Sequence, residues 1–318
     1  MKKYLTIALT VIVTLTLSVL GFIFNSPSLT QNQLDTLLIL AIVCGSSILY
    51  CFIVGEIANN NSQMDKLWSI LPIAYTWIVA VKGGFNPRLV VYAIIVTLWG
   101  IRLTINFARK GAYRLKFWEG EEDYRWAILR KNKLFKSRFM WALFDLFFIC
   151  IYQNVLVLAI CLPALACMES TTSFGVFDYI AATSATLFLL LETIADEQQW
   201  KFHQNKKRYI NEVKSLEELP EPYDLGFNTF GLWKVMRHPN YLGEQAIWLC
   251  LYIFVIGSGN AVYGIFNWSM VGPLFLVLLF LGSSTFGESI SASKYLRYSD
   301  YQKQVFKYLP LRRFNPNK

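Results

Sequence analysis

The chain has 318 residues, of which 55% are hydrophobic and only 16% are charged. Soluble domains carry about 25% charged residues because their surface faces water, so this composition excludes a soluble enzyme and also a disordered or collagen-like chain. The net charge of +9 would suit nucleic-acid binding, but the basic residues lie between apolar stretches. We therefore expect no nucleic-acid partner, and the sequence predicts an all-α, polytopic integral membrane protein.

The apolar stretches predict about eight transmembrane helices, since a helix needs about 20 mostly apolar residues to cross a bilayer. In chain order they cover residues 4–24, 36–55, 67–82, 89–107, 141–163, 177–195, 245–262 and 268–286. The first resembles a secretory signal, but its apolar run is longer than the usual h-region of about 7–15 residues, and no clean cleavage site follows. We therefore expect this helix to be retained. The third stretch is short for a span.

The basic residues predict the orientation of these helices. Of the 30 Lys and Arg residues, all but Lys82, Arg88 and Arg102 fall in the loops on the side of the two termini. Because basic loops stay in the cytoplasm, both termini are expected there. The large polar segments on that side are 108–140, 196–244 and 287–318. A water-soluble cofactor should therefore bind in a cavity that faces the cytoplasm.

The common metal and nucleotide signatures are absent from the sequence. The six cysteines form no CxxC pair, and the chain has only two histidines, so we expect no metal site. There is no P-loop and no HExxH motif, and Gly257-Ser-Gly259 fails as a Rossmann fingerprint because Val262 replaces its third glycine. A cofactor would have to be held by other means.

One polar stretch stands where the seventh predicted helix begins. Pro239 suits the first turn of a helix, where its missing N–H costs nothing. A helix N-terminus has a positive potential, and Arg237 and His238 would add to it, which favours a phosphate. Asn240 and Glu244 are four residues apart on one face, as amide and carboxylate partners for a ribose or a carboxamide. A helix cap with snorkelling basic residues is the alternative interpretation.

Two further polar sets lie where the sixth and eighth predicted helices leave the membrane. They are Asp196, Gln199 and His203, and Glu288, Ser291 and Tyr295. An ionisable group near the bilayer is costly, so a helix retains one when it is paired or used. Ordinary interfacial capping explains each set alone, but three sets beside one helix start predict a binding site.

These residues carry a resemblance to a known family. They read Ala195-Asp-Glu-Gln198, then Gly231-Leu-Trp and Arg237-His-Pro-Asn-Tyr-Leu-Gly-Glu244, then Glu288, Tyr295, Tyr301 and Leu309-Pro310. In them the chain resembles the steroid 5-alpha-reductase superfamily, most closely its bacterial members of unknown function. The resemblance covers 178–310 well and 60–125 thinly, through Asp65-Lys-Leu-Trp68 and Trp99-Gly-Ile-Arg102. Residues 1–60 are then separate N-terminal membrane helices, and 61–318 a reductase-like domain.

The resemblance implies an NADPH-dependent reductase of a carbon–carbon double bond, placed in a bacterial inner membrane. Its substrate would be apolar (a steroid, an isoprenoid or a lipid) and would enter from the bilayer. By position in the family, the cofactor would contact Asp196, Asn240, Glu244 and Tyr295. Matches to the related sterol reductases add Arg237, His238 and Tyr241. Arg102 falls near a basic family residue, and Glu288 joins the set as the acid of the eighth helix.

The family's proton-donating pair, a glutamate with a tyrosine, is less well preserved. Asp65 is the best candidate for the acid, and Glu56 is the second. A rough alignment places Trp99 at the tyrosine position, and tryptophan cannot supply that proton. This departure argues against a steroid 3-ketone as the substrate.

Two other functions compete with reduction. Isoprenylcysteine and phospholipid methyltransferases share the architecture and an Arg-His-Pro-x-Tyr motif, but they bind S-adenosylmethionine. Asn240, Glu244 and Asp196 follow the reductase pattern instead. A non-catalytic lipid-binding protein is the third reading, and the carboxylates retained at bilayer depth argue against it.

Overall fold

The structure, a computed structural model, describes residues 28–211 and 218–316. Helices dominate these residues, and the only β structure among them is an isolated bridge between Val262 and Phe266. This agrees with the predicted all-α class. The first predicted span, 4–24, lies outside the described residues.

The helices follow the apolar stretches of the sequence. They are α2 (Gln31–Ala58), α3 (Gln63–Leu67), α4 (Leu71–Lys82), α5 (Pro87–Ala108), α6 (Tyr124–Arg130), α7 (Arg138–Phe144), α8 (Gln153–Ala166), α9 (Val176–Ile210), α10 (Pro239–Gly257), α11 (Val271–Lys294) and α12 (Tyr298–Gln304). A π-helical segment, Asp145–Tyr152, joins α7 to α8. Short 3-10 turns cover Lys133–Phe135, Gly231–Lys234 and Trp268–Met270.

Five helical stretches of the described residues are long and apolar enough to cross a membrane, which indicates an integral membrane protein. They are Gln31–Ala58, Pro87–Ala108, Arg138–Ala166, Val176–Ile210 and Trp268–Lys294. Leu71–Lys82 is a shorter apolar helix, and α10 has 19 residues. The predicted count of eight spans stays a prediction.

The chain divides into two compact units. The first contains residues 1–183 and 249–276, and the second contains 184–248 and 277–318. The boundaries therefore fall inside helices α9, α10 and α11.

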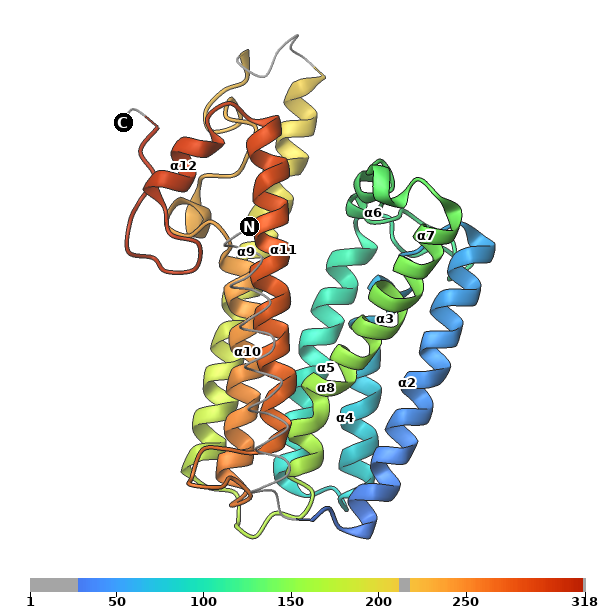
Figure 1. Cartoon of the computed structure of the whole chain (residues 1–318). Coiled ribbons are helices and arrows are strands. Elements are labelled where there is room, and N and C mark those ends of the chain that lie inside the picture. Colours follow the sequence, from blue (N-terminus) through green and yellow to red (C-terminus); the bar gives the residue numbers. More distant parts are fainter. Residues whose placement is uncertain (1–27, 212–217, 317–318) are drawn as a thin grey trace. The chain divides into compact units, whose positions relative to one another are not determined.

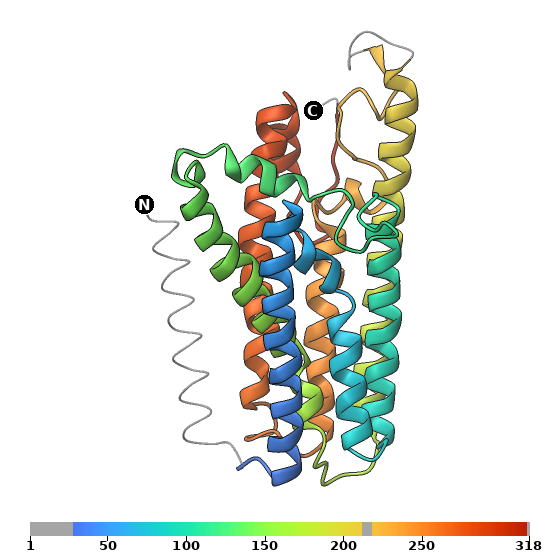
Figure 2. The same cartoon turned by 90° about the vertical axis from the view of Figure 1, so that its right-hand side faces the viewer.

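In the first unit, α4 packs against α5 and α8, and α2 packs against α8 (Figures 1 and 2). Their contacts bury Tyr75 and Trp99 completely. Gly100 permits the close approach of α5, because a Cβ there would meet the Ile73 side chain and the Ser69 carbonyl. Small residues at such positions let membrane helices approach each other closely.

A buried ion pair joins several elements at one end of the first unit. Nε of Arg88, at the start of α5, lies 2.5 Å from Oδ1 of Asp178, near the start of α9, and both side chains are 1% exposed. The remaining guanidinium N–H groups donate to acceptors that include the Ser173 and Gly257 carbonyl oxygens. Asp178 also accepts the backbone N–H of Gly175. All charge at this position is therefore paired and hydrogen-bonded, as burial requires.

In the second unit, the stretch before α10 is held by the C-terminal segment. The backbone N–H groups of Arg237 and His238 donate to the carbonyl oxygens of Phe306 and Lys307. The N–H of Phe314 donates to the carbonyl of Lys234. An aromatic core lies between α12 and this segment, and it consists of Phe227, Tyr298, Tyr301, Val305 and Phe314. The last residues of the chain thus fix how α10 begins.

Replacing Arg88 with Met should destabilise the protein, since Asp178 would remain buried without its partner. Removal of one member of a buried ion pair costs about 3–5 kcal/mol. We expect the free energy of unfolding of Arg88→Met to fall by about this amount, measured by chemical denaturation in detergent. The double variant Arg88→Met/Asp178→Leu removes both charges and should regain most of the loss. Wild-type stability in Arg88→Met would contradict this role.

Candidate functional site

Glu288, on α11, is the centre of the polar site in the second unit. Its Oε1 accepts from Nε of Arg237 at 2.7 Å and lies 2.9 Å from Nε2 of His238. Its Oε2 accepts from the Gln302 side chain at 3.0 Å, and Lys307 Nζ lies 3.9 Å away. Glu288 is 6% exposed, so these contacts replace water around a buried carboxylate. The partners of Glu288 are far from it in the sequence, so the sequence could not predict these contacts. The polar set on the eighth predicted helix did include Glu288.

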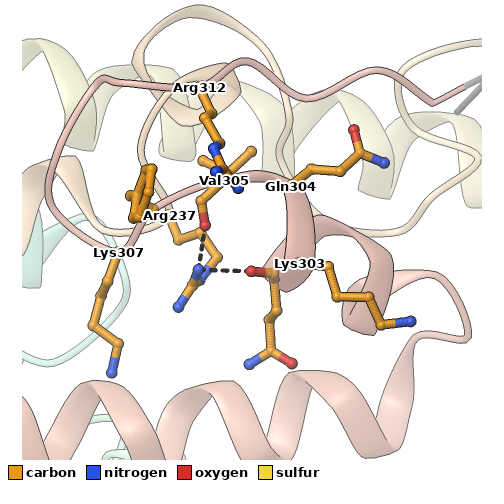
Figure 3. Close-up of a pocket in the computed structure, with 8 residues that line it drawn as sticks. Arg237, Lys303, Gln304, Val305, Lys307 and Arg312 are labelled. Atoms are coloured by element: carbon orange, nitrogen blue, oxygen red, sulfur yellow. Dashed lines mark hydrogen bonds between the residues drawn. The ribbon is translucent and has the colours of Figure 1, made fainter.

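Arg237 makes several hydrogen bonds within the protein. Besides Glu288, its guanidinium donates to the carbonyl oxygens of Gln302 at 3.1 Å and of Val305, as Figure 3 shows. A planar guanidinium suits such a fork of acceptors. The structure therefore makes Arg237 a brace between α11 and the C-terminal segment, and its predicted phosphate contact stays a prediction.

Burial favours the neutral form of His238. Burial lowers the pKa of its imidazole below the ordinary value of 6.5, and the hydrogen bond and charge of Glu288 oppose this only in part. Its ring stacks on Tyr241, with centroids 5.1 Å apart and planes 21° apart. The expected positive potential at this helix start therefore depends on the helix dipole and not on a charged histidine.

Asn240 joins the first turn of α10 to α9. Its Nδ2 donates to Oδ1 of Asp196 at 3.1 Å, so two residues from separate predicted sets meet. The carbonyl oxygen of the Asn240 side chain is buried and has no hydrogen-bond partner among the residues that the structure describes. Oε1 of Gln199, three residues after Asp196, is in the same state. Buried acceptors without partners are rare in folded proteins and mark a place where a donor is missing.

Glu244 lies one turn further along α10 and is 4% exposed. Its Oε1 accepts from the indole N–H of Trp248 at 3.2 Å. Gly243 makes this part of α10 fit against α9, because a Cβ there would meet the Glu192 side chain and the Phe188 carbonyl. Asn240 and Glu244 share a helix face as expected.

Two parts of the sequence motif are in contact at the end of α9. The backbone N–H of Leu232 donates to Oε1 of Gln198 at 2.9 Å, and the indole of Trp233 donates to the Ala195 carbonyl at 3.0 Å. Gly231 has a φ of 60°, and a side chain there would overlap Gln198. This explains why the stretch begins with glycine.

Tyr295 contacts a lysine that sequence reasoning missed. The amine of Lys206, on α9, donates to the Gly226 carbonyl at 2.6 Å and lies 3.3 Å from the Tyr295 hydroxyl. Lys206 is only 9% exposed, although it opens the run Lys206-Lys207-Arg208. A basic run normally indicates a solvated face, so no signal in the sequence separated this lysine from its neighbours.

Asp65, the predicted acid, lies in the first unit on α3. Its Oδ2 accepts from the indole N–H of Trp126 at 2.9 Å, and Arg125 lies 3.9 Å from its Oδ1. Burial raises the pKa of Asp65 above its ordinary range, and the positive charge of Arg125 opposes this effect. Asp65 therefore holds its proton more firmly than an exposed aspartate does.

Lys66 fixes the segment that carries Asp65. Its amine donates to the carbonyl oxygens of Phe117 at 2.7 Å and of Glu119 at 2.8 Å. Burial lowers the pKa of this amine to about 8. The loop after α5 is thus held over α3 by a lysine that points inward.

The other predicted residues of the first unit are Glu56, at the end of α2, and Arg102, on α5, both half-buried. Trp99 is fully buried. Sequence reasoning missed Asp145, which opens the π-helical segment and has no exposed surface. Neither of its carboxylate oxygens has a hydrogen-bond partner within residues 28–211 and 218–316. A single aspartate in an apolar run was its only signal. Every predicted cofactor residue except Arg102 belongs to the second unit.

Glu288→Gln should lower the pKa of His238 further, because the carboxylate is what raises it against burial. NMR titration of the two histidines measures this directly, and His203 serves as the internal control. In the wild type, the lowered pKa of His238 also makes the free energy of unfolding depend on pH. The contribution of His238 is fully present above the ordinary histidine pKa and declines as the pH falls below it, because the unfolded chain takes up the proton first. An unchanged pKa of His238 in the variant would contradict the pairing.

Comparison with known proteins shows the family. The family described as "Protein of unknown function (DUF1295)" matches residues 51–305. An uncharacterized protein of Schizosaccharomyces pombe is 34% identical over 284 residues, which are 83% of this chain and 78% of that protein. No solved structure matches the chain. The chain therefore belongs to the DUF1295 family, which is related to the steroid 5-alpha-reductases.

Proposed function

We propose that the protein is a membrane-embedded, NADPH-dependent reductase of a carbon–carbon double bond in an apolar substrate. The observation that carries this proposal is the state of Asn240. Asp196 orients its amide through one N–H, and its carbonyl oxygen is buried without a partner in the described part of the chain. This acceptor lies in the first turn of α10.

The unpaired oxygens fit the carboxamide end of a nicotinamide cofactor. A carboxamide offers two N–H donors, and Asn240 Oδ1 and Gln199 Oε1 are acceptors that lack donors. A bound donor would remove a penalty of about 1–3 kcal/mol for each buried acceptor that it satisfies. The free N–H groups at the start of α10 would favour the phosphates of the same molecule.

The surrounding residues would keep this site in shape. Glu288 holds Arg237 and His238 in place, and His238 supports the ring of Tyr241. Groups held in this way need no reorganisation when a ligand binds, which favours affinity. When bound, NADPH supplies the hydride for the reduction.

Asp65 is the residue proposed to hold the proton that completes the reduction. A carboxyl group works as a general acid at neutral pH when burial raises its pKa, as it does here. The indole N–H of Trp126 fixes one carboxyl oxygen. Turnover should then fall as the pH rises through the raised pKa of Asp65, because the proton is lost.

Asn240→Ala and Glu244→Gln should each weaken NADPH binding by about 1–3 kcal/mol, the usual cost of a lost buried hydrogen bond. Calorimetry on the purified protein in detergent measures the affinity. Asn205→Ala is a matched control, because Asn205 is exposed on α9 and its amide donates to the Tyr223 hydroxyl, outside the proposed site. Unchanged NADPH affinity in both site variants, with S-adenosylmethionine bound instead, would favour methyl transfer.

Asp65→Asn should lower turnover about 10²–10⁴-fold and leave NADPH binding intact, because it removes a general acid. Asparagine keeps the size and can still accept from Trp126. The variant should also lose the decline of turnover at high pH. Glu56→Gln is the comparison, and it should retain most of the activity. A variant Asp65→Asn that folds, binds NADPH and reduces substrate at the wild-type rate would eliminate Asp65 as the acid.

A further inference from the structure

The C-terminal segment forms a basic pocket, and among the residues of the proposed reductase site only Arg237 lines it. Its volume is about 260 Å3, and its lining includes Arg237, Lys303, Lys307 and Arg312 (Figure 3). Pockets for whole drug-sized ligands measure about 300–1,000 Å3, so this one suits a small group and not a dinucleotide.

Cations outnumber the carboxylates that pair with them in this pocket. Arg237 pairs with Glu288, and Lys303 lies 3.2 Å from Asp300. Arg312 lies over the ring of Phe306, 5.0 Å from its centroid, and meets no carboxylate among the described residues. A surplus of positive charge around a pocket this small favours an anionic group with several oxygen acceptors, such as a phosphate.

Phe306 lines this pocket, and two further exposed apolar side chains, Leu309 and Leu311, follow it in the chain before Arg312. Phe306 is 39% exposed, Leu309 is 54% exposed and Leu311 is 68% exposed. They alternate along the chain with Lys307, Arg312 and Arg313. Large apolar side chains interleaved with basic ones are typical of protein segments that lie at the interface of an anionic membrane. A free phosphate would give these apolar side chains no partner, whereas acyl chains would cover them.

We infer that this pocket binds the phosphate of an anionic phospholipid, whose acyl chains lie over Phe306, Leu309 and Leu311. The basic loops of this chain are expected on the cytoplasmic side, where the membrane surface carries negative charge. The lipid would hold down the segment whose backbone fixes the start of α10. This inference does not depend on the reaction proposed above.

The test is a binding measurement on the full chain in a neutral maltoside detergent. Dioctanoyl phosphatidylglycerol is the probe, and dioctanoyl phosphatidylcholine and inorganic phosphate are its comparisons, with affinities from native mass spectrometry and calorimetry. We expect phosphatidylglycerol to bind at least tenfold more tightly than either. In the variant Lys303→Gln/Arg312→Gln its affinity should fall about tenfold or more, because each basic residue contributes to anionic-lipid binding.

The matched control is Arg114→Gln/Lys116→Gln, which removes the same two residue types from exposed positions of the loop after α5. It should bind phosphatidylglycerol as the wild type does. Leu309→Ser/Leu311→Ser keeps every charge and should also weaken phosphatidylglycerol binding. Size-exclusion chromatography checks that each variant is folded, and the altered side chains are exposed.

Three results would overturn the inference. One is equal affinity for phosphatidylglycerol and phosphatidylcholine, and another is wild-type affinity in Lys303→Gln/Arg312→Gln. The third is competition for the pocket by another phosphate compound. It would be seen if inorganic phosphate displaces the lipid at equal concentration. It would also be seen if NADPH displaces the lipid and binds more weakly to Lys303→Gln/Arg312→Gln. A protein that binds phosphatidylglycerol as expected but no NADPH would refute the proposed reductase and leave the lipid site standing.

Discussion

The second unit depends on the burial of one carboxylate. A carboxylate that is buried loses its hydrogen bonds to water and needs other partners in their place. For Glu288 these partners are Arg237, His238 and Gln302. These partners come from the start of α10 and from α12, so satisfying one charge fixes three parts of the chain at once. Arg88 and Asp178 solve the same problem in the first unit, again with partners from segments far apart in the sequence. In a chain that has so few charged residues, these two buried ion pairs each connect segments that lie far apart in the sequence.

The sequence predicted the fold class because apolar length is a strong and local signal. Stretches of about 20 apolar residues became α2, α5, α9 and α11, and the ends of α2 and α5 differ from the predicted ones by only a few residues. Polar helix ends were harder to predict. α9 continues to Ile210, well beyond the expected end at 195, because its polar part packs against the motif residues Leu232 and Trp233. Hydropathy predicts the apolar part of a helix. It cannot predict where the helix ends when its last turns are polar and pack against other polar residues.

The candidate site was predicted as sets of residues but not as pairs. Spacing along a helix places Asn240 and Glu244 on one face, and the structure agrees. Spacing cannot show that Asp196 reaches Asn240, or that Arg237 pairs with Glu288. Lys206 and Asp145 were missed for opposite reasons. The first is hidden in a solvated basic run, and the second stands alone in an apolar one.

The way the C-terminal segment holds the start of α10 has a consequence for synthesis. A chain emerges from the ribosome with its N-terminal part first, so Arg237 and His238 leave long before Phe306 and Lys307, whose carbonyl oxygens they require. The first turn of α10 therefore lacks these acceptors until the segment around Phe306 and Lys307 has been made. A nascent chain that already contains α10 completes the start of this helix only when that later segment folds back onto it.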